Sequence, residues 1–300
     1  MDAVNDAANH TAESVPGPRS ADLAGDGDHA ACDGIDRATG DGIDRATGDG
    51  IDRAARDGID RAARGNRLYP RVTSFRSRRG ALTPQQQQSW ERMWPRIGRD
   101  VSDEKLDADA WFGRSAPLIV EIGCGTGTAT AAMAQAEPEF NLIGVEVYKP
   151  GVAQLVQRVE REQIENIRIL RGDAVDVLEH MVAPESLTGV RVFFPDPWPK
   201  ARHHKRRLLQ AATFTLIASR LRPGGVLHVA TDHADYAEWI AEVGKGESQL
   251  IGMNEATGGD SARYLETAPI GFERPITKFE GKGLRAGSAI TEFIWGKIES

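Results

Sequence analysis

The sequence predicts an α/β protein organised around a doubly wound, mostly parallel sheet. Short apolar runs typical of buried strands recur along the chain, and stretches with helical spacing lie between them. Acidic residues or glycines stand at the ends of several of these runs, where parallel strands lead into ligand-binding loops. The expected strands span residues 118–122, 142–147, 167–170, 190–194 and 226–230. Because helices alternate with strands, each connection is long enough for the crossover that parallel pairing requires.

A helix is expected before the first strand. Thr83 and Pro84 are the residue types of an N-cap and a first helical position, and Gly98 marks the end of the helix. Trp90 and Trp94 lie between these limits at helical spacing. Such aromatic residues are expected in the core and not on a surface that stacks bases.

Further elements follow the first strand. An alanine-rich helix is expected there, ended by Pro138, and residues 148–162 show apolar positions at helical spacing. Near the end of the chain the pattern changes, and Leu250-Ile251 and Ile290–Trp295 are expected to pair as an antiparallel hairpin.

The first 65 residues have a different composition. An octapeptide is repeated four times, in copies that start at Asp33, Asp41, Asp49 and Asp57. One isoleucine per repeat buries too little surface to offset the entropy of ordering, so residues 1–65 are expected to form a disordered tail. This tail has 14 acidic and 7 basic residues and so accounts for the whole net charge of −7. Residues 66–300 are expected to form one electrically balanced domain.

Composition narrows the protein class further. No apolar run approaches the roughly 20 residues that a membrane span needs, and no signal peptide is evident. Cys32 and Cys124 lie in different contexts, which does not suggest a disulfide framework. We expect a cytoplasmic protein, a monomer or homodimer, without membrane contact and without a metal.

The stretch from Val192 to Arg207 has the most distinctive chemistry. Three prolines alternate around Asp196 and Trp198, which predicts a stiff loop at the carboxyl end of a strand. A carboxylate and an aromatic ring held rigidly beside a basic segment suggest a site that handles a base within a phosphate-rich partner. A run of basic residues follows this loop, and a run of that kind is most often a solvated helix face. A helix is expected to start near Lys205, however, and cations at a helix N-terminus oppose its dipole, so an anionic partner such as RNA explains them better. The cluster consists of Lys200, Arg202, His203, His204, Lys205, Arg206 and Arg207. A second basic segment contains Arg71, Arg76, Arg78 and Arg79.

A glycine-rich turn follows the first strand. Its glycines, Gly123, Gly125 and Gly127, are spaced more closely than those of the dinucleotide fingerprint, which favours S-adenosylmethionine as the ligand. Three acids stand at or near the ends of successive strands. Glu121 is expected to face the cationic methionyl group, Glu146 the ribose hydroxyls and Asp173 the adenine amino group.

From Arg71 to Lys297 the chain resembles the bacterial tRNA (guanine-N7)-methyltransferases, which are class I S-adenosylmethionine-dependent enzymes. The most specific element of the resemblance is Phe194-Pro-Asp-Pro-Trp-Pro-Lys200, with Pro199 where the family often has histidine. Ala230-Thr-Asp-His233 and Thr277-Lys-Phe-Glu280 resemble two further motifs of the family.

The resemblance implies a Rossmann-like sheet of seven strands and a tRNA substrate, methylated on N7 of the guanosine at position 46 in the variable loop. Asp196 would be catalytic and would also contact the cofactor. The substrate contacts would be Lys200, Asp232, Thr277, Lys278, Phe279 and Glu280, with Arg202 to Arg207 on the RNA.

Alternatives to these interpretations stay open. Asp232 follows a strand directly, so it could be a plain helix cap. The enzyme could methylate another amine, although exocyclic-amine enzymes favour two adjacent prolines after their acid. The chain could also be an RNA-binding scaffold without catalysis, which a labelled-methyl incorporation assay would reveal.

Overall fold

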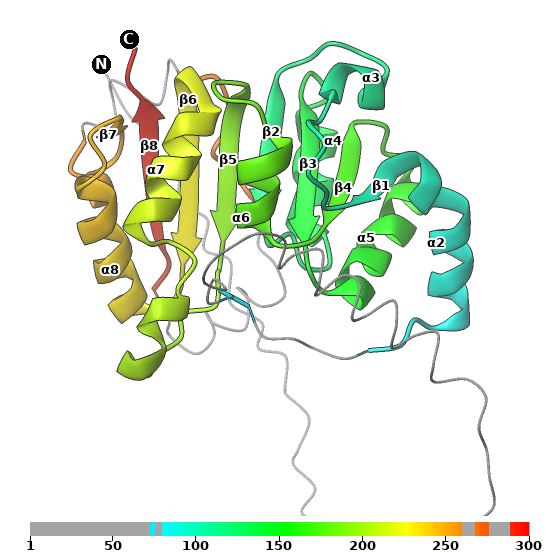
Figure 1. Ribbon diagram of the computed structural model, residues 1–300, viewed down its shortest axis with the longest axis horizontal. Helices are drawn as coiled ribbons and strands as arrows, with labels where there is room; N and C mark the ends of the chain where they lie inside the picture. Colours follow the sequence, from blue (N-terminus) through cyan, green and yellow to red (C-terminus); the bar gives the residue numbers. More distant parts are fainter. Residues whose placement is uncertain (1–72, 76–79, 260–267, 276–288, 300) are drawn as a thin grey trace, which may run out of the picture. The chain divides into compact units, whose positions relative to one another are not determined.

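A computed structural model describes residues 73–75, 80–259, 268–275 and 289–299 of the chain. The expected tail, all four arginines of the second basic segment and Thr277 to Glu280 lie outside these residues. At the centre of the structure is one eight-stranded sheet with the order β1-β4-β3-β2-β5-β6-β8-β7 (Figure 1). Strands β1 to β6 pair in parallel, whereas β8 is antiparallel to both β6 and β7. The expected doubly wound sheet and the antiparallel pair at its end are therefore confirmed.

The strands have the following bounds: β1 Gly98–Asp100, β2 Leu118–Ile122, β3 Asn141–Glu146, β4 Ile167–Arg171, β5 Leu187–Phe193, β6 Leu221–Thr231, β7 Leu250–Gly252 and β8 Thr291–Lys297. The sheet thus has eight strands and not the expected seven. The additional strand, β1, has only three residues at the sheet edge and no apolar run. Its hydrogen bonds to β4 define it, and these cannot be inferred from its own sequence.

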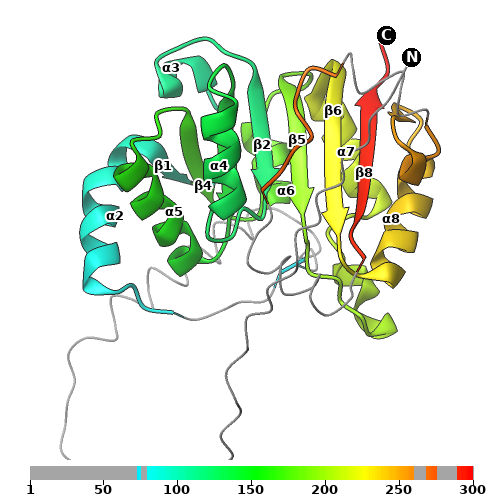
Figure 2. The same ribbon diagram turned by 180° about the vertical axis from the view of Figure 1, so that it is seen from behind.

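The helices are α2 Pro84–Ile97, α3 Ala108–Phe112, α4 Thr128–Ala136, α5 Lys149–Glu162, α6 Ala174–Asp176, α7 Ala211–Arg220 and α8 Ala234–Lys245. Helices α6, α7 and α8 cover one face of the sheet, and α2, α4 and α5 cover the other (Figures 1 and 2). Neighbouring strand residues alternate between these two cores: Ile119 packs on the side of α4 and α5, and Val120 on the side of α7. Continuously buried strands such as β2 are typical of a sheet covered on both faces.

Helix α2 begins and packs as its sequence predicts. The Thr83 hydroxyl accepts a hydrogen bond from the Gln86 amide (3.2 Å), and the Gln86 side chain accepts one from the Thr83 amide (2.9 Å). The rings of Trp90 and Trp94 stack with centroids 4.0 Å apart, and Trp90 is buried. The expectation that these aromatic residues belong to the core is confirmed for Trp90.

The prediction that a helix starts near Lys205 is wrong. Residues Ala201–Arg206 form a short 3₁₀ turn, and α7 starts only at Ala211. The reason lies at Leu209, whose amide donates to the Tyr236 hydroxyl (3.2 Å) and whose carbonyl accepts from the Trp239 indole (2.8 Å). Because α8 side chains use both backbone groups, the chain cannot continue as a helix here. The argument from the helix dipole therefore does not apply to the cationic cluster.

The order of the strands defines where a ligand can bind. From β2 the chain moves outward through β3 and β4, and it then returns to β5 on the other side of β2. Adjacent parallel strands that diverge in this way form a switch point, and ligands bind at its carboxyl edge. Ile122 of β2 is in register with Val192 of β5, so the glycine turn and the Asp196 loop leave the same edge. In the described part of the chain, no helix has the length and apolar character of a membrane span.

Candidate active site

The glycine turn after β2 lies beside open space. Gly123 and Gly125 have φ angles of 75° and 57°, values that side chains rarely tolerate. A Cβ atom on Gly123 would meet no described atom within 4 Å, and one on Gly125 would meet only a carbonyl oxygen at 3.9 Å. Gly127 differs, because a Cβ there would lie 2.3 Å from Leu155 of α5. The first two glycines therefore border a space in which a ligand can approach the backbone, and the third permits close helix packing.

Glu146, at the end of β3, holds this turn in place. One carboxylate oxygen accepts from the Gly125 amide (3.0 Å), and the other accepts from the amides of Val147 and Tyr148 (2.8 Å each). A carboxylate offers about four acceptor sites, so about one stays open for a ribose hydroxyl. Glu146 thus has a structural role at the turn that the sequence did not predict.

Glu121 is a buried acid with an unused acceptor. Only 3% of the residue is exposed, and its Oε2 has no hydrogen-bond partner among the described residues. Burial raises the pKa of the Glu121 carboxyl to about 7, while Thr130 and the positive charge of Arg191 oppose the rise. A cationic ligand would favour the ionised carboxylate. The site therefore fits a sulfonium group.

Asp173 follows β4, the next strand along the sheet. Its carboxylate caps α6 by accepting a hydrogen bond from the Val175 amide (3.0 Å). The adjacent Gly172 amide donates to the Glu146 carbonyl (3.1 Å), which joins the two strand ends. Glu121 and Glu146 thus lie in β2 and β3, and Asp173 follows β4, so the three acids come from adjacent strands at one edge of the sheet.

The loop after β5 holds Asp196 between two residues of unusual conformation. Asp196 is exposed, whereas Phe194 and Trp198 have φ angles of 51° and 46°. Such angles in non-glycine residues cost on the order of 1–3 kcal/mol each and concentrate at functional sites. The Phe194 amide donates to the Ala230 carbonyl (2.8 Å), and the Trp198 indole donates to the Ser74 carbonyl (2.9 Å). These bonds hold the loop in its strained shape.

Trp198 does not have the position of a base-stacking platform. It is only 3% exposed, and the Arg206 guanidinium lies 4.0 Å from the centroid of its ring. Arg206 also donates to the carbonyls of Thr73 (3.2 Å) and Phe75 (3.1 Å). Trp198 and Arg206 together bind the segment 73–75 to the loop that includes Asp196. The sequence suggested an aromatic that handles a base, and the burial of the ring argues against that role.

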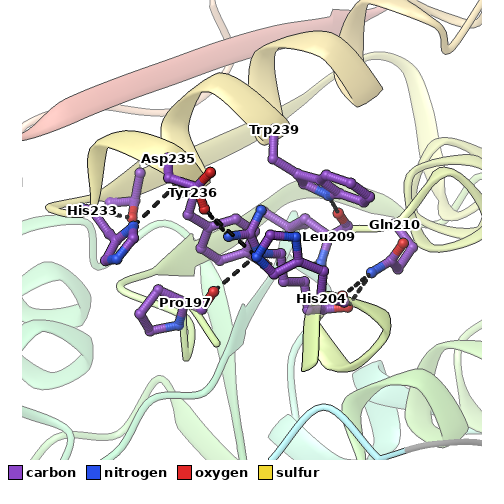
Figure 3. A network of polar contacts seen from close by, with 10 residues as sticks. Pro197, His204, Leu209, Gln210, His233, Asp235, Tyr236 and Trp239 are labelled. Atoms are coloured by element: carbon purple, nitrogen blue, oxygen red, sulfur yellow. Dashed lines mark hydrogen bonds and ion pairs between the residues drawn. The ribbon is translucent and has the colours of Figure 1, made fainter. Parts of the chain in front are cut away.

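The cationic cluster divides into outward and inward members. Lys200, Arg202 and Lys205 are exposed, while His203, His204 and Arg206 are half-buried. Arg207 is 2% exposed, forms an ion pair with Asp235 and donates to the Pro197 carbonyl (3.0 Å). These two partners are labelled in Figure 3. The expectation that Arg207 faces RNA therefore does not agree with its position in the structure.

Asp232 lies at the carboxyl end of β6, next to the Asp196 loop. It is exposed, and it does not cap the following helix. The cap of α8 is His233, whose Nδ1 accepts from the Tyr236 amide (3.3 Å). The helix-cap alternative for Asp232 is therefore excluded, and its carboxylate remains a candidate for substrate recognition.

Sequence reasoning missed three residues at this edge. Asp235 binds Arg207, and Arg274 forms an ion pair with Glu292 (2.7 Å) while lying 5.0 Å from the Phe194 ring. A Cβ on Gly151 would lie 2.8 Å from the Gly125 carbonyl, so α5 can approach the turn only with glycine there. A glycine in the first turn of a helix was a usable signal, whereas the two charged residues gave none.

The fold and this site define a class I S-adenosylmethionine-dependent methyltransferase. A family model described as "Putative methyltransferase" matches residues 115–293. A tRNA (guanine-N(7)-)-methyltransferase of Nocardia farcinica is 69% identical over 299 residues, which cover 100% of both chains. Another from Rhodococcus jostii is 68% identical over 236 residues, 79% of this chain and 87% of that protein. The chain therefore belongs to the tRNA (guanine-N7-)-methyltransferase family, as the resemblance in its sequence indicated.

A solved rRNA methylase from Streptococcus thermophilus aligns with a TM-score of 0.41 at 14% identity, covering 61% of this chain and 88% of its own.

Proposed function

We propose that this chain transfers the methyl group of S-adenosylmethionine to N7 of a guanosine in the variable loop of tRNA. The relatives named above support the reaction class. The observation that supports the chemistry is that the glycine turn and the Asp196 loop leave adjacent strands at the switch point. A tRNA substrate is consistent with a cytoplasmic enzyme.

The cofactor site consists of the glycine turn and the acids beside it. When bound, S-adenosylmethionine supplies a methyl group activated by a positively charged sulfur. The Gly123–Gly127 turn allows close backbone approach, and Glu121 provides a buried negative charge for the sulfonium side. Glu146 has acceptor capacity for a ribose hydroxyl, and Asp173 is assigned to the adenine amino group.

Asp196 is the proposed catalytic residue. Guanine N7 has an in-plane lone pair and no proton, so the reaction does not require a general base. The protein must instead align N7 with the methyl group and exclude water. The Asp196 carboxylate stabilises the positive charge that spreads over the guanine ring as N7 is alkylated. Its strained, multiply anchored loop gives this carboxylate a fixed position before the substrate binds.

Guanine selection is assigned to carboxylates near Asp196. Guanine presents two donors on one edge, its N1–H and its N2 amino group, and adenine lacks this pair. Asp232 is exposed at the end of β6, directly beside the strand that leads to Asp196, and can accept from this edge. Glu280, with Thr277, Lys278 and Phe279, is assigned to the substrate by family resemblance alone.

The exposed cations Lys200, Arg202 and Lys205 are assigned to tRNA phosphates, with His203, His204 and Arg206 at their margin. They follow the Asp196 loop directly, so RNA bound to them lies near the reaction centre. Since the domain has no net positive charge overall, RNA binding must come from such a local patch.

Mapping the modified nucleotide tests the proposal. The full chain is incubated with bulk tRNA and S-adenosylmethionine labelled in its methyl group, and the labelled nucleotide is identified. We expect 7-methylguanosine in the variable loop. Label on an exocyclic amine, or no incorporation by folded protein that binds tRNA, would contradict the proposed reaction.

A further inference from the structure

Arg207 is a fully buried cation in a loop of exposed cations. Its side chain is 1% exposed, whereas Lys200, Arg202 and Lys205 face solvent. A buried guanidinium must be paired and hydrogen-bonded, because loss of hydration is otherwise unfavourable. The partners of Arg207 therefore indicate what its charge does in this protein.

The guanidinium joins two segments, the loop after β5 and helix α8, whose contacting residues Pro197, Asp235, Tyr236 and Trp239 are labelled in Figure 3. Its Nε donates to the Pro197 carbonyl (3.0 Å), and its Nη2 binds the Asp235 carboxylate. It also lies 4.9 Å from the ring centroid of Tyr236 and 5.4 Å from that of Trp239. Pro197 belongs to the loop after β5, while the other three partners belong to the first turns of α8.

These partners lie next to the proposed reactive groups. Pro197 directly follows Asp196, and Asp235 comes three residues after Asp232. The peptide groups that follow Arg207 are fixed to α8 as well, since Leu209 bonds to both Tyr236 and Trp239. The Arg207 side chain thus links the loop of Asp196 directly to the helix that begins after Asp232.

Asp235 reaches the guanidinium from the solvent side, as its side chain is 56% exposed. A phosphate that approached Arg207 would therefore have to replace Asp235. The pKa of the Asp235 carboxyl lies below its ordinary value, chiefly because of its hydrogen bond to Arg207.

We propose that Arg207 is a positioning residue that, together with Asp235, holds Asp196 and Asp232 at the separation the reaction needs, and that it is not an RNA contact. This inference rests on the proposed roles of Asp196 and Asp232. It assigns the cationic cluster two functions: outward cations bind phosphate, and the inward arginine aligns the reacting groups.

Removing Asp235 separates the two roles because they predict effects of different kinds. If Arg207 positions the loop, Asp235→Ala should lower the single-turnover rate of methyl transfer by about ten- to a hundredfold, since small displacements of reacting groups have large effects. The Kd for tRNA and its salt dependence should stay near wild type. If Arg207 is instead an RNA contact, Asp235→Ala makes its guanidinium available to a phosphate. The tRNA should then bind more tightly, with a steeper salt dependence.

A charge-conserving variant provides an independent arm. Arg207→Lys keeps the positive charge but cannot bind both the Pro197 carbonyl and Asp235 with a fork of donors. We expect a similar loss of rate and an unchanged salt dependence of tRNA binding. Glu238→Ala, an exposed acid on the same helix, is the matched control and should retain the wild-type rate and affinity. Thermal unfolding verifies that each variant is folded.

An Asp235→Ala variant with wild-type rate, or with tighter tRNA binding, would overturn the inference. So would a folded Arg207→Lys variant with wild-type rate. Failure of the proposed function gives a different result from failure of this inference. In that case the wild-type chain itself would not produce 7-methylguanosine.

Discussion

At the scale of single residues, the acids at the sheet edge have different environments and therefore different tasks. Glu121 is buried and lacks a partner for one oxygen among the described residues, Glu146 accepts from three backbone amides, and Asp196 is exposed on a strained loop. A carboxylate held by three amides is a structural element of the turn. A buried carboxyl with a raised pKa is matched to a cation, and an exposed one on a rigid loop is matched to the substrate.

The first prediction concerns Glu121, which we expect to make cofactor binding depend on pH. Its pKa of about 7 exceeds the ordinary value of 4.5, so the folded state retains this proton more tightly than the unfolded chain. The free energy of unfolding therefore falls as pH rises from about 4.5 through about 7. A sulfonium ligand favours the ionised form, so cofactor affinity should rise with pH over the upper part of this range.

Glu121→Gln tests this account. The variant should bind S-adenosylmethionine about ten- to a hundredfold more weakly at pH above 7, which corresponds to about 1.5–3 kcal/mol for a charged hydrogen bond. Without cofactor it should be more stable than wild type at that pH, because no buried charge forms. Calorimetric titrations and thermal unfolding below and above pH 7 measure both effects. If wild-type affinity proved independent of pH, Glu121 would not contact the cation.

Asp196→Asn tests the catalytic assignment. The amide keeps the shape of the side chain and removes its charge, so the charge that develops on the guanine ring loses its stabilisation. We expect methyl transfer to slow by at least about a hundredfold, the usual effect of losing one electrostatic contact to a transition state. The Kd of S-adenosylmethionine should be largely unchanged. Normal turnover by this variant would remove Asp196 from the mechanism.

At the scale of elements, the strands and the ligand turn could be predicted, and the conformation of the cationic stretch could not. Strand β2 coincides with its predicted bounds because a short apolar run before glycines has few other interpretations. The 3₁₀ turn at Ala201–Arg206 depends on α8, whose side chains bond the backbone at Leu209. That contact joins residues about 30 positions apart and leaves no local signal.

The same reason explains why the burial of Trp198 and Arg207 could not be predicted. The Trp198 ring is buried because Ser74, far away in sequence, accepts its indole proton. Arg207 is buried because Asp235 lies opposite it in the fold. Sequence shows which residues have charge or aromaticity, but the partner that turns a side chain inward becomes known only from tertiary structure.

A separate prediction concerns tRNA binding by the exposed cations of the loop after Asp196. Replacing Lys200, Arg202 and Lys205 by glutamine should weaken tRNA binding and lower the slope of its logarithmic salt dependence by roughly one per cation. The rate at saturating tRNA and the affinity for cofactor should change little. The control is Lys245→Gln, which removes one positive charge from the C-terminal end of α8. An unchanged salt dependence in the triple variant would exclude these residues from the RNA interface.

At the scale of the described domain, the glycine turn and the acids proposed for the reaction all lie at one edge of the sheet. In the proposed mechanism, the acids at the ends of β4, β3 and β2 contact the cofactor, and those after β5 and β6 contact the base. Two layers of helices bury both faces of the sheet, which leaves the loops at its carboxyl edge available for binding. The central claim is that the glycine turn and the Asp196 loop enclose a single crevice.

A crystal structure of the chain with S-adenosylhomocysteine tests this claim most directly. We predict that the ligand lies against the turn at Gly123–Gly127, with its sulfur toward the Asp196 loop and near the buried carboxyl of Glu121. A ligand bound elsewhere, or one whose sulfur points away from Asp196, would contradict the account.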